Sequence, residues 1–241
     1  SIAFDANPSI YVDSELRNHQ LRYVQILQSM MSEGAEDISV GQINILLPAE
    51  REQVLEGWNQ TQHAVAECNS AALFEQQVRR TPLAAAVTFE GSSLTYAELN
   101  ERANQLAHEL IQTYGAGPEQ VVGIAMPRSL EVVIAIVAVH KTGAAYLPLD
   151  PDYPEERLIY MLEDAKPACV VTVMKNNFSH IPQVSSIPIL VMDEPDRIQA
   201  VSGRSGSNPE DDDLTGTASL LNPAYLIYTS GSAGRPKAVV V

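Results

Sequence analysis

The stretch VVGIAMPRSLEVVIAIVAVHKTGAAYLPL, residues 121–149, decides the fold of this chain. Residues 121–126 form a short apolar run, which is typical of a strand buried on both faces. Ser129 can cap the helix that follows, and Gly143 can end it. A second apolar run at 144–149 returns as a strand. The stretch therefore predicts a strand–helix–strand unit with parallel strands.

Further elements of both kinds surround this unit. Thr95 and Glu98 have the spacing of a capping box, which predicts a helix that begins there and ends near Gly115. Other helices are expected at residues 14–31, 48–58, 71–80 and 154–165, and strands at 85–89, 168–173, 188–192 and 224–228. Apolar strands separated by helices indicate the α/β class, with helices packed on both faces of a mostly parallel sheet.

The composition excludes several classes of protein. The chain has 241 residues, of which 45% are hydrophobic, enough to supply a core. It carries 30 acidic against 15 basic residues, a formal net charge of −15, so duplex nucleic acid is not expected as a partner. The longest apolar run of its most hydrophobic region, residues 132–139, is far shorter than the ~20 residues of a membrane-spanning helix. We therefore expect neither a nucleic-acid nor a membrane partner.

The cysteines and the two ends suggest where and in what form the chain exists. Cys68 and Cys169 are too few for a disulfide framework, and Cys169 lies in an apolar run where burial is expected. A reducing, cytoplasmic location fits this cysteine usage. The chain has no initiator Met, and its last residues, 238–241, are an apolar run that stops without a turn signal. These features predict that both ends are cuts within a longer polypeptide.

Acidic residues are unevenly distributed along the second half. Residues 193–213 hold seven acidic and two basic side chains and are interleaved with Ser, Gly and Pro, which predicts a solvated loop. Residues 214–241 contain no acidic side chain but carry Arg235 and Lys237. The tail is therefore a mildly positive segment of an acidic protein.

The segment YLIYTSGSAGRPK, residues 225–237, is the one that indicates chemistry. An apolar strand leads into a loop with three hydroxyls, two glycines and Lys237, a combination suited to polyphosphate. The spacing differs from a Walker loop, because Lys237 follows Gly234 by three residues and Ala238 replaces the expected hydroxyl. A Gly/Ser loop alone is more often a plain turn. The preceding strand, the lysine and the local absence of acid favour phosphate binding.

This loop resembles the phosphate-binding signature of nonribosomal peptide synthetase adenylation domains, which are adenylate-forming enzymes. Residues 94–99, LTYAEL, resemble the first core motif of that family, and residues 141–150, KTGAAYLPLD, resemble the second. Three motifs in the family's order make the resemblance specific. It implies that the first two are structural supports. It assigns nucleotide phosphate binding to the third, at Thr229, Ser230, Gly231, Ser232, Gly234 and Lys237.

The resemblance also implies a division of the chain. Residues 1–40 resemble the C-terminal tail of a condensation domain, and residues 41–70 resemble the linker to an adenylation domain. Residues 71–241 then form a truncated N-terminal portion of that adenylation domain, ending just after the phosphate loop. The five histidines are isolated in sequence, so neither the His-His signature of condensation catalysis nor a metal site is expected.

The function implied is amino-acid activation. In the family, ATP with Mg²⁺ and an amino acid give an aminoacyl-adenylate, and a phosphopantetheine thiol on a carrier domain then accepts the acyl group. Condensation and carrier domains of the same assembly line are the expected partners. The family's amino-acid pocket, magnesium carboxylate and catalytic lysine lie beyond the segment that the resemblance covers, so the fragment alone is expected to be inactive, with catalytic residues and substrate identity unassigned.

Three other interpretations stay open, and two positions depart from the family. The alternatives are a non-catalytic scaffold or docking fragment, another adenylate-forming ligase such as an acyl-CoA synthetase, and an unrelated nucleotide-binding α/β domain. The family has Thr where this chain has Ala233, and Gly where it has Ala238. Loss of one hydroxyl donor to a charged phosphate costs roughly 1.5–3 kcal/mol, about ten- to a hundredfold in affinity.

Overall fold

The computed structural model describes residues 3–32, 39–175, 186–229 and 236–241. The chain divides into two compact units, Ser1–Ala66 and Glu67–Val241.

The first unit is helical. Helices α1 (Asp13–Met30) and α2 (Pro48–Leu55) are joined by an ion pair between Arg22 and Glu50. Short 3₁₀ turns, η2 and η3, lie at Val40–Gln42 and Gly57–Asn59. Pro48 occupies the first turn of α2, as the sequence indicates, but this helix ends before the expected residue 58. Neither α1 nor α2 contains a buried residue among those described, so this unit has no packed core of its own there.

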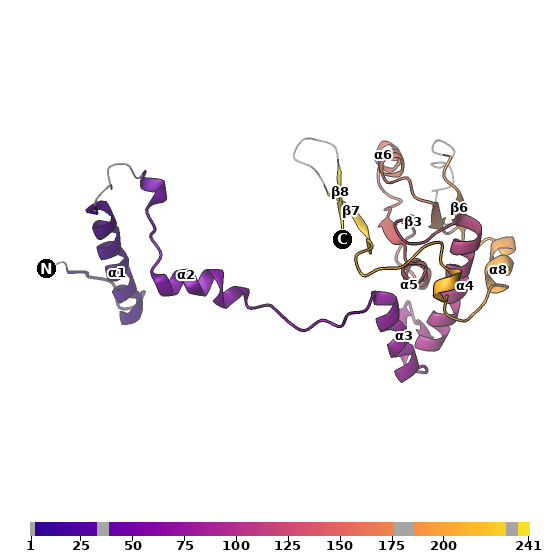
Figure 1. The fold of residues 1–241 in the computed structure, drawn as a ribbon, viewed down its shortest axis with the longest axis horizontal. Helices are drawn as coiled ribbons and strands as arrows, with labels where there is room; N and C mark the ends of the chain where they lie inside the picture. Colours follow the sequence, from indigo (N-terminus) through magenta and orange to yellow (C-terminus); the bar gives the residue numbers. More distant parts are fainter. Residues whose placement is uncertain (1–2, 33–38, 176–185, 230–235) are drawn as a thin grey trace. The chain divides into compact units, whose positions relative to one another are not determined.

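The second unit is built on a parallel sheet (Figure 1). Its described strands run in the order β4-β3-β5-β6, with Val122 aligned to Tyr146 on one side and to Cys169 on the other. The strands are β3 (Val121–Ala125), β4 (Ala145–Pro148), β5 (Cys169–Thr172) and β6 (Ile189–Val191). Helix α5 (Leu130–Thr142) connects β3 to β4, and α6 (Glu155–Ala165) connects β4 to β5. The predicted strand–helix–strand unit is confirmed.

Both faces of the sheet are covered. Helices α4 (Tyr96–Tyr114) and α5 share one apolar cluster with Val122, Ile124 and Cys169. The adjacent residues along the strands, such as Ala125 and Val170, face the opposite way and pack with α6. The predicted α/β architecture with helices on both faces is therefore confirmed. Within the described helices, none is both long and apolar enough to cross a membrane.

The capping residues and glycines in the sequence correctly predict the ends of α4 and α5. Thr95 accepts from the backbone N–H of Glu98 at 3.2 Å, and the Glu98 carboxylate accepts from the backbone N–H of Thr95 at 2.8 Å. Ser129 accepts from the backbone N–H three residues later at 3.2 Å. Gly115 and Gly143 end their helices with φ of 68° and 80°, a left-handed conformation that glycine adopts without a steric cost.

One strand was missed. Strand β2 (Ser92–Thr95) pairs antiparallel with β1 (Ala85–Phe89), the strand that the sequence predicts. The two residues between them, Glu90 and Gly91, have φ of 47° and 82°, which suits a tight hairpin turn. Ser-Ser-Leu-Thr has too little apolar alternation to identify the second strand. Helix α3 (Ser70–Arg80), expected at 71–80, begins after Asn69, whose side chain accepts from Ala72 N–H at 2.8 Å.

The prediction of a solvated loop across residues 193–213 is wrong for its first part. Helix α8 (Pro195–Ser202) forms there, and the segment that follows packs on α4. Arg204 forms an ion pair with buried Glu109 at 2.7 Å, and Asn104 donates to the Gly206 carbonyl at 2.7 Å. The acidic residues 210–213 are exposed, as expected. The charge pattern alone predicts a solvated segment. It does not reveal the packing on α4, because the residues that contact this segment lie far away in sequence.

Candidate functional site

Two paired strands, called the hairpin below, flank the phosphate-loop sequence. Strands β7 (Leu226–Thr229) and β8 (Lys237–Val240) pair antiparallel, with Thr229 directly opposite Lys237 at the loop end. The strand expected at 224–228 is thus confirmed, shifted by one or two residues. Of the six predicted phosphate-binding residues, the structure brings together Thr229 and Lys237. The other four lie outside the described residues: Ser230, Gly231, Ser232 and Gly234.

The hairpin presents different side chains on its two faces. Leu226 and Tyr228 are buried in the cluster that contains α6, whereas Ile227 and Thr229 alternate with them and are exposed. Lys237, opposite Thr229, is also exposed. The Thr229 hydroxyl makes only a long contact of 3.5 Å to the Lys237 carbonyl among the interactions described. Thr229 and Lys237 are therefore paired at the loop end with both side chains exposed, so an anion can reach the hydroxyl donor and the ammonium group.

The base of the hairpin is attached to the parallel sheet. Tyr225 forms a parallel bridge with Tyr146 of β4, and Tyr146 N–H donates to the Ala224 carbonyl at 3.2 Å. The two tyrosine rings lie 5.6 Å apart between centroids. Tyr146 belongs to the second core motif, so this part of the motif supports the hairpin that carries Thr229 and Lys237.

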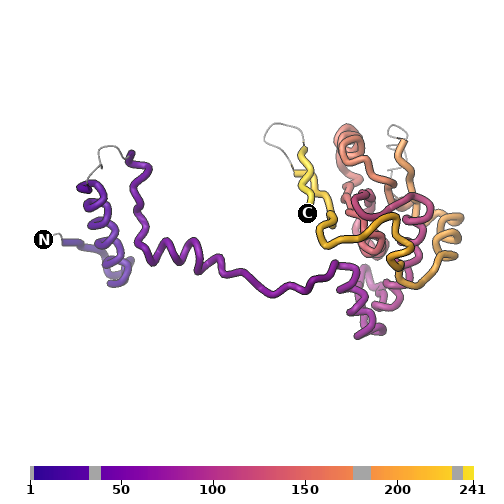
Figure 2. Tube along the Cα trace, viewed as in Figure 1, coloured from indigo at the N-terminus to yellow at the C-terminus, as the bar shows by residue number. Residues whose placement is uncertain are grey.

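The loop end of the hairpin is attached to α6. The Tyr228 hydroxyl donates to Asp164 Oδ2 at 2.6 Å, and the Tyr160 hydroxyl donates to the Pro236 carbonyl at 3.2 Å. Burial, and to a lesser extent Asp164, raises the pKa of Tyr228, which keeps this hydroxyl protonated as a donor. Figure 2 shows the hairpin beside α6. Sequence analysis missed Tyr160 and Asp164, for which the only local signal is their four-residue spacing on a helix.

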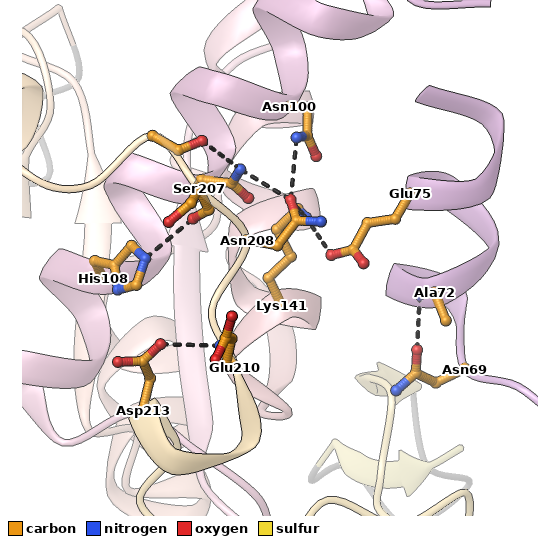
Figure 3. A network of polar contacts seen from close by, with 12 residues as sticks. Asn69, Ala72, Glu75, Asn100, His108, Lys141, Ser207, Asn208, Glu210 and Asp213 are labelled. Atoms are coloured by element: carbon orange, nitrogen blue, oxygen red, sulfur yellow. Dashed lines mark hydrogen bonds and ion pairs between the residues drawn. The ribbon is translucent and has the colours of Figure 1, made fainter. Parts of the chain in front are cut away.

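Lys141 of the second core motif has a structural role. Its Nζ lies 2.5 Å from Glu75 Oε1 and 3.1 Å from Asn208 Oδ1, and its side chain is 1% exposed (Figure 3). Burial lowers the pKa of Lys141, while the bond to Glu75 opposes that shift. Asn208 Oδ1 also accepts from the side-chain amides of Asn100 and Asn104, at 3.1 and 2.9 Å. Lys141 of α5 therefore links this helix to α3 and to the segment after α8.

The structure describes one of the two positions that depart from the family signature. Ala238 lies in β8, half-buried opposite Tyr228, and it is not among the described residues with positive φ. The backbone at this position therefore does not require glycine. Ala233 lies outside the described residues.

The described residues do not form a metal centre. Among them, no three His, Cys, Asp or Glu side chains gather as a metal-binding group. His140 hydrogen bonds through Nδ1 to the Ser70 hydroxyl at 2.8 Å, and His108 Nε2 lies 3.1 Å from the Ser207 carbonyl. Cys169 is buried, as expected, and its thiol is free, as is that of half-buried Cys68. The described residues therefore do not fit a magnesium site.

Comparison with known protein sequences identifies relatives of this chain. Residues 74–241 match the family described as AMP-binding enzyme. The chain is 44% identical over 240 residues to a dimodular nonribosomal peptide synthase of Bacillus subtilis (strain 168), covering all of the chain and 10% of that protein. It is 37% identical over 242 residues to tyrocidine synthase 2 of Brevibacillus parabrevis, covering all of the chain and 6% of that protein. The chain thus spans a tenth or less of the length of these relatives.

Solved structures share the fold. A crystal structure of the nonribosomal peptide synthetase FmoA3 in its α-methyl-L-serine-AMP bound form matches with a TM-score of 0.71 and 25% identity, over 96% of this chain and 24% of that one. VinN in complex with 3-methylaspartate matches in fold alone, with a TM-score of 0.60 and 23% identity, over 70% of this chain and 46% of that one. The chain therefore belongs to the AMP-binding enzyme family and carries a portion of a nonribosomal peptide synthetase adenylation domain.

Proposed function

We propose that this chain supplies the nucleotide phosphate-binding hairpin of an adenylation domain that activates an amino acid with ATP. The observation that carries the proposal is the pairing of Thr229 with Lys237 at the loop end of β7 and β8, in a segment free of acidic residues. FmoA3, which shares the fold, is described with an aminoacyl adenylate bound, and this supports an aminoacyl-adenylate as the product here.

The reaction is a substitution at phosphorus. A carboxylate oxygen of the amino acid attacks the α-phosphorus of ATP, the bond from that phosphorus to the bridging oxygen breaks, and pyrophosphate leaves with the negative charge. The Lys237 ammonium and the Thr229 hydroxyl stabilise the charge that grows on the leaving phosphates. Ser230, Gly231, Ser232 and Gly234 take part through their hydroxyls and backbone N–H groups, as their sequence pattern indicates.

The remaining machinery belongs to the larger protein. Residues 1–40 are the tail of a condensation domain, residues 41–70 are a linker, and residues 71–241 are the adenylation portion. Mg²⁺ is bound by the complete domain through residues outside this chain. A carrier domain accepts the aminoacyl group on its phosphopantetheine thiol, and the fragment alone is inactive. The lack of a buried residue in α1 supports its assignment to a neighbouring domain.

ATP–pyrophosphate exchange in the complete adenylation domain tests the proposal. Lys237→Ala should raise the KM for ATP at least tenfold, because a charge-assisted bond to phosphate is lost. Lys175→Ala, at an exposed lysine after β5, is the matched control and should leave this KM unchanged. An unchanged KM in Lys237→Ala would remove the hairpin from the nucleotide site. If no amino acid supports pyrophosphate exchange, the scaffold interpretation is favoured. If a carboxylic acid is joined to CoA as a thioester, an acyl-CoA synthetase is favoured.

A further inference from the structure

We propose that Tyr160 and Asp164 of α6 are positioning residues, which hold the two strands of the hairpin so that Thr229 and Lys237 meet the nucleotide phosphates in a fixed arrangement. This inference rests on the proposed function and assigns a role within the same site to two residues outside the three core motifs. It is carried by two side-chain contacts from one helix, one to Tyr228 of β7 and one to Pro236, which directly precedes β8.

Each contact is one residue away from a proposed phosphate-binding side chain. Asp164 accepts from the hydroxyl of Tyr228, which directly precedes Thr229, at 2.6 Å. Tyr160 donates to the carbonyl of Pro236, which directly precedes Lys237, at 3.2 Å. Because residues four apart in a helix lie on the same face, one turn of α6 reaches both strands.

The hairpin needs such an attachment at its loop end. A two-stranded hairpin is marginally stable in water, and here its base is attached to β4 through Tyr146 and Tyr225. At the other end, Pro236 has no backbone N–H to donate to the ladder, but its carbonyl is held by Tyr160. The two ends of the hairpin are therefore fixed by different elements, β4 at the base and α6 near the loop.

The contacts leave the proposed phosphate face free. Tyr228 is 8% exposed and lies on the buried face of β7, and its ring packs edge-on against Tyr160 at 6.3 Å between centroids. Thr229 and Lys237 lie on the exposed face. Asp164 thus binds the hairpin from the side opposite the two phosphate-binding groups, so its negative charge is directed away from them. The arrangement orders the site without occupying it.

Steady-state kinetics in the complete adenylation domain test this inference. Tyr228→Phe, Asp164→Ala and Tyr160→Phe should each raise the KM for ATP by roughly three- to tenfold, the effect of one lost hydrogen bond. The KM for the amino acid should stay unchanged, because the hairpin holds the phosphates alone. Glu163→Gln, at the exposed carboxylate beside Asp164, is the control. The double variant of Tyr228 and Asp164 should be no worse than either single variant, since both remove the same bond.

A purely structural role gives a different result. It would lower kcat through a smaller active fraction and leave the KM for ATP unchanged, and that outcome would overturn the inference. Hydrogen exchange of the amides in residues 226–229 and 237–240, measured without nucleotide, should be faster in Tyr228→Phe and Tyr160→Phe than in Glu163→Gln. Equal rates would also overturn it. Because this second measurement does not depend on activity, failure of the attachment is distinguishable from failure of the proposed function.

Discussion

Lys141 Nζ lies 2.5 Å from Glu75 Oε1, and this ion pair joins α5 to α3. The two side chains differ in exposure, at 1% for Lys141 and 22% for Glu75. The ammonium is therefore almost fully desolvated, whereas the carboxylate retains contact with water. Since a buried charge without a partner costs far more than a solvated one, the two partners should respond differently to mutation.

Glu75→Ala should be the more harmful change of the two. It leaves the buried Lys141 ammonium with the neutral Asn208 side chain and the Phe74 ring as its remaining described partners, and it should destabilise the second unit by about 2–4 kcal/mol. Lys141→Met, which fills the same space with an apolar chain, should cost less, because Glu75 can turn to water. Denaturant unfolding measures both, with Glu163→Gln as a control. Equal costs for the two variants would contradict the argument.

How much of this could be predicted depended on the range of each interaction. The capping box at Thr95 and the stop at Gly143 were predictable because their partners lie within one helical turn. The resemblance also indicated a supporting role for Lys141, but not its partner Glu75, which is 66 residues away. The same holds for the candidate site. The sequence identified Thr229 and Lys237 but not their attachment to α6, because nothing local connects Tyr160 to Pro236.

Arg204 provides a second test of long-range packing. Its guanidinium compensates Glu109 on α4, which is 2% exposed, at 2.7 Å. Arg204→Met should leave that carboxylate buried and unpaired, and the partly exposed position of Arg204 reduces the expected cost to about 1–3 kcal/mol. Arg80→Met, at an exposed arginine that ends α3, should change the free energy of unfolding little. If both variants unfold at the same denaturant concentration, the ion pair between Arg204 and Glu109 does not contribute to the stability of the second unit.

His140 should make the second unit sensitive to mild acid. Burial lowers the pKa of His140 below its ordinary value of 6.5, so the unfolded chain binds this proton more readily than the folded one. Stability from this group is therefore complete above pH 6.5 and is lost as the pH falls from 6.5 toward the lower folded-state value. His140→Gln should reduce the loss of unfolding free energy between about pH 7 and pH 5. His63→Gln, in the exposed part of the first unit, should leave the pH dependence of the second unit unchanged.

The two departures from the family signature should behave oppositely when they are reversed. Ala233→Thr restores a hydroxyl donor in the proposed phosphate loop, and it should lower the KM for ATP of the complete domain by about ten- to a hundredfold. Ala238→Gly should give no such gain, because this position is an ordinary strand residue whose backbone does not require glycine. It should instead destabilise the hairpin by about 0.5–1 kcal/mol, since glycine loses more conformational freedom on folding. Pyrophosphate exchange and thermal unfolding of the two variants separate these effects. A gain in ATP affinity from Ala238→Gly would show that a closer approach of the backbone at this position matters more than the missing hydroxyl.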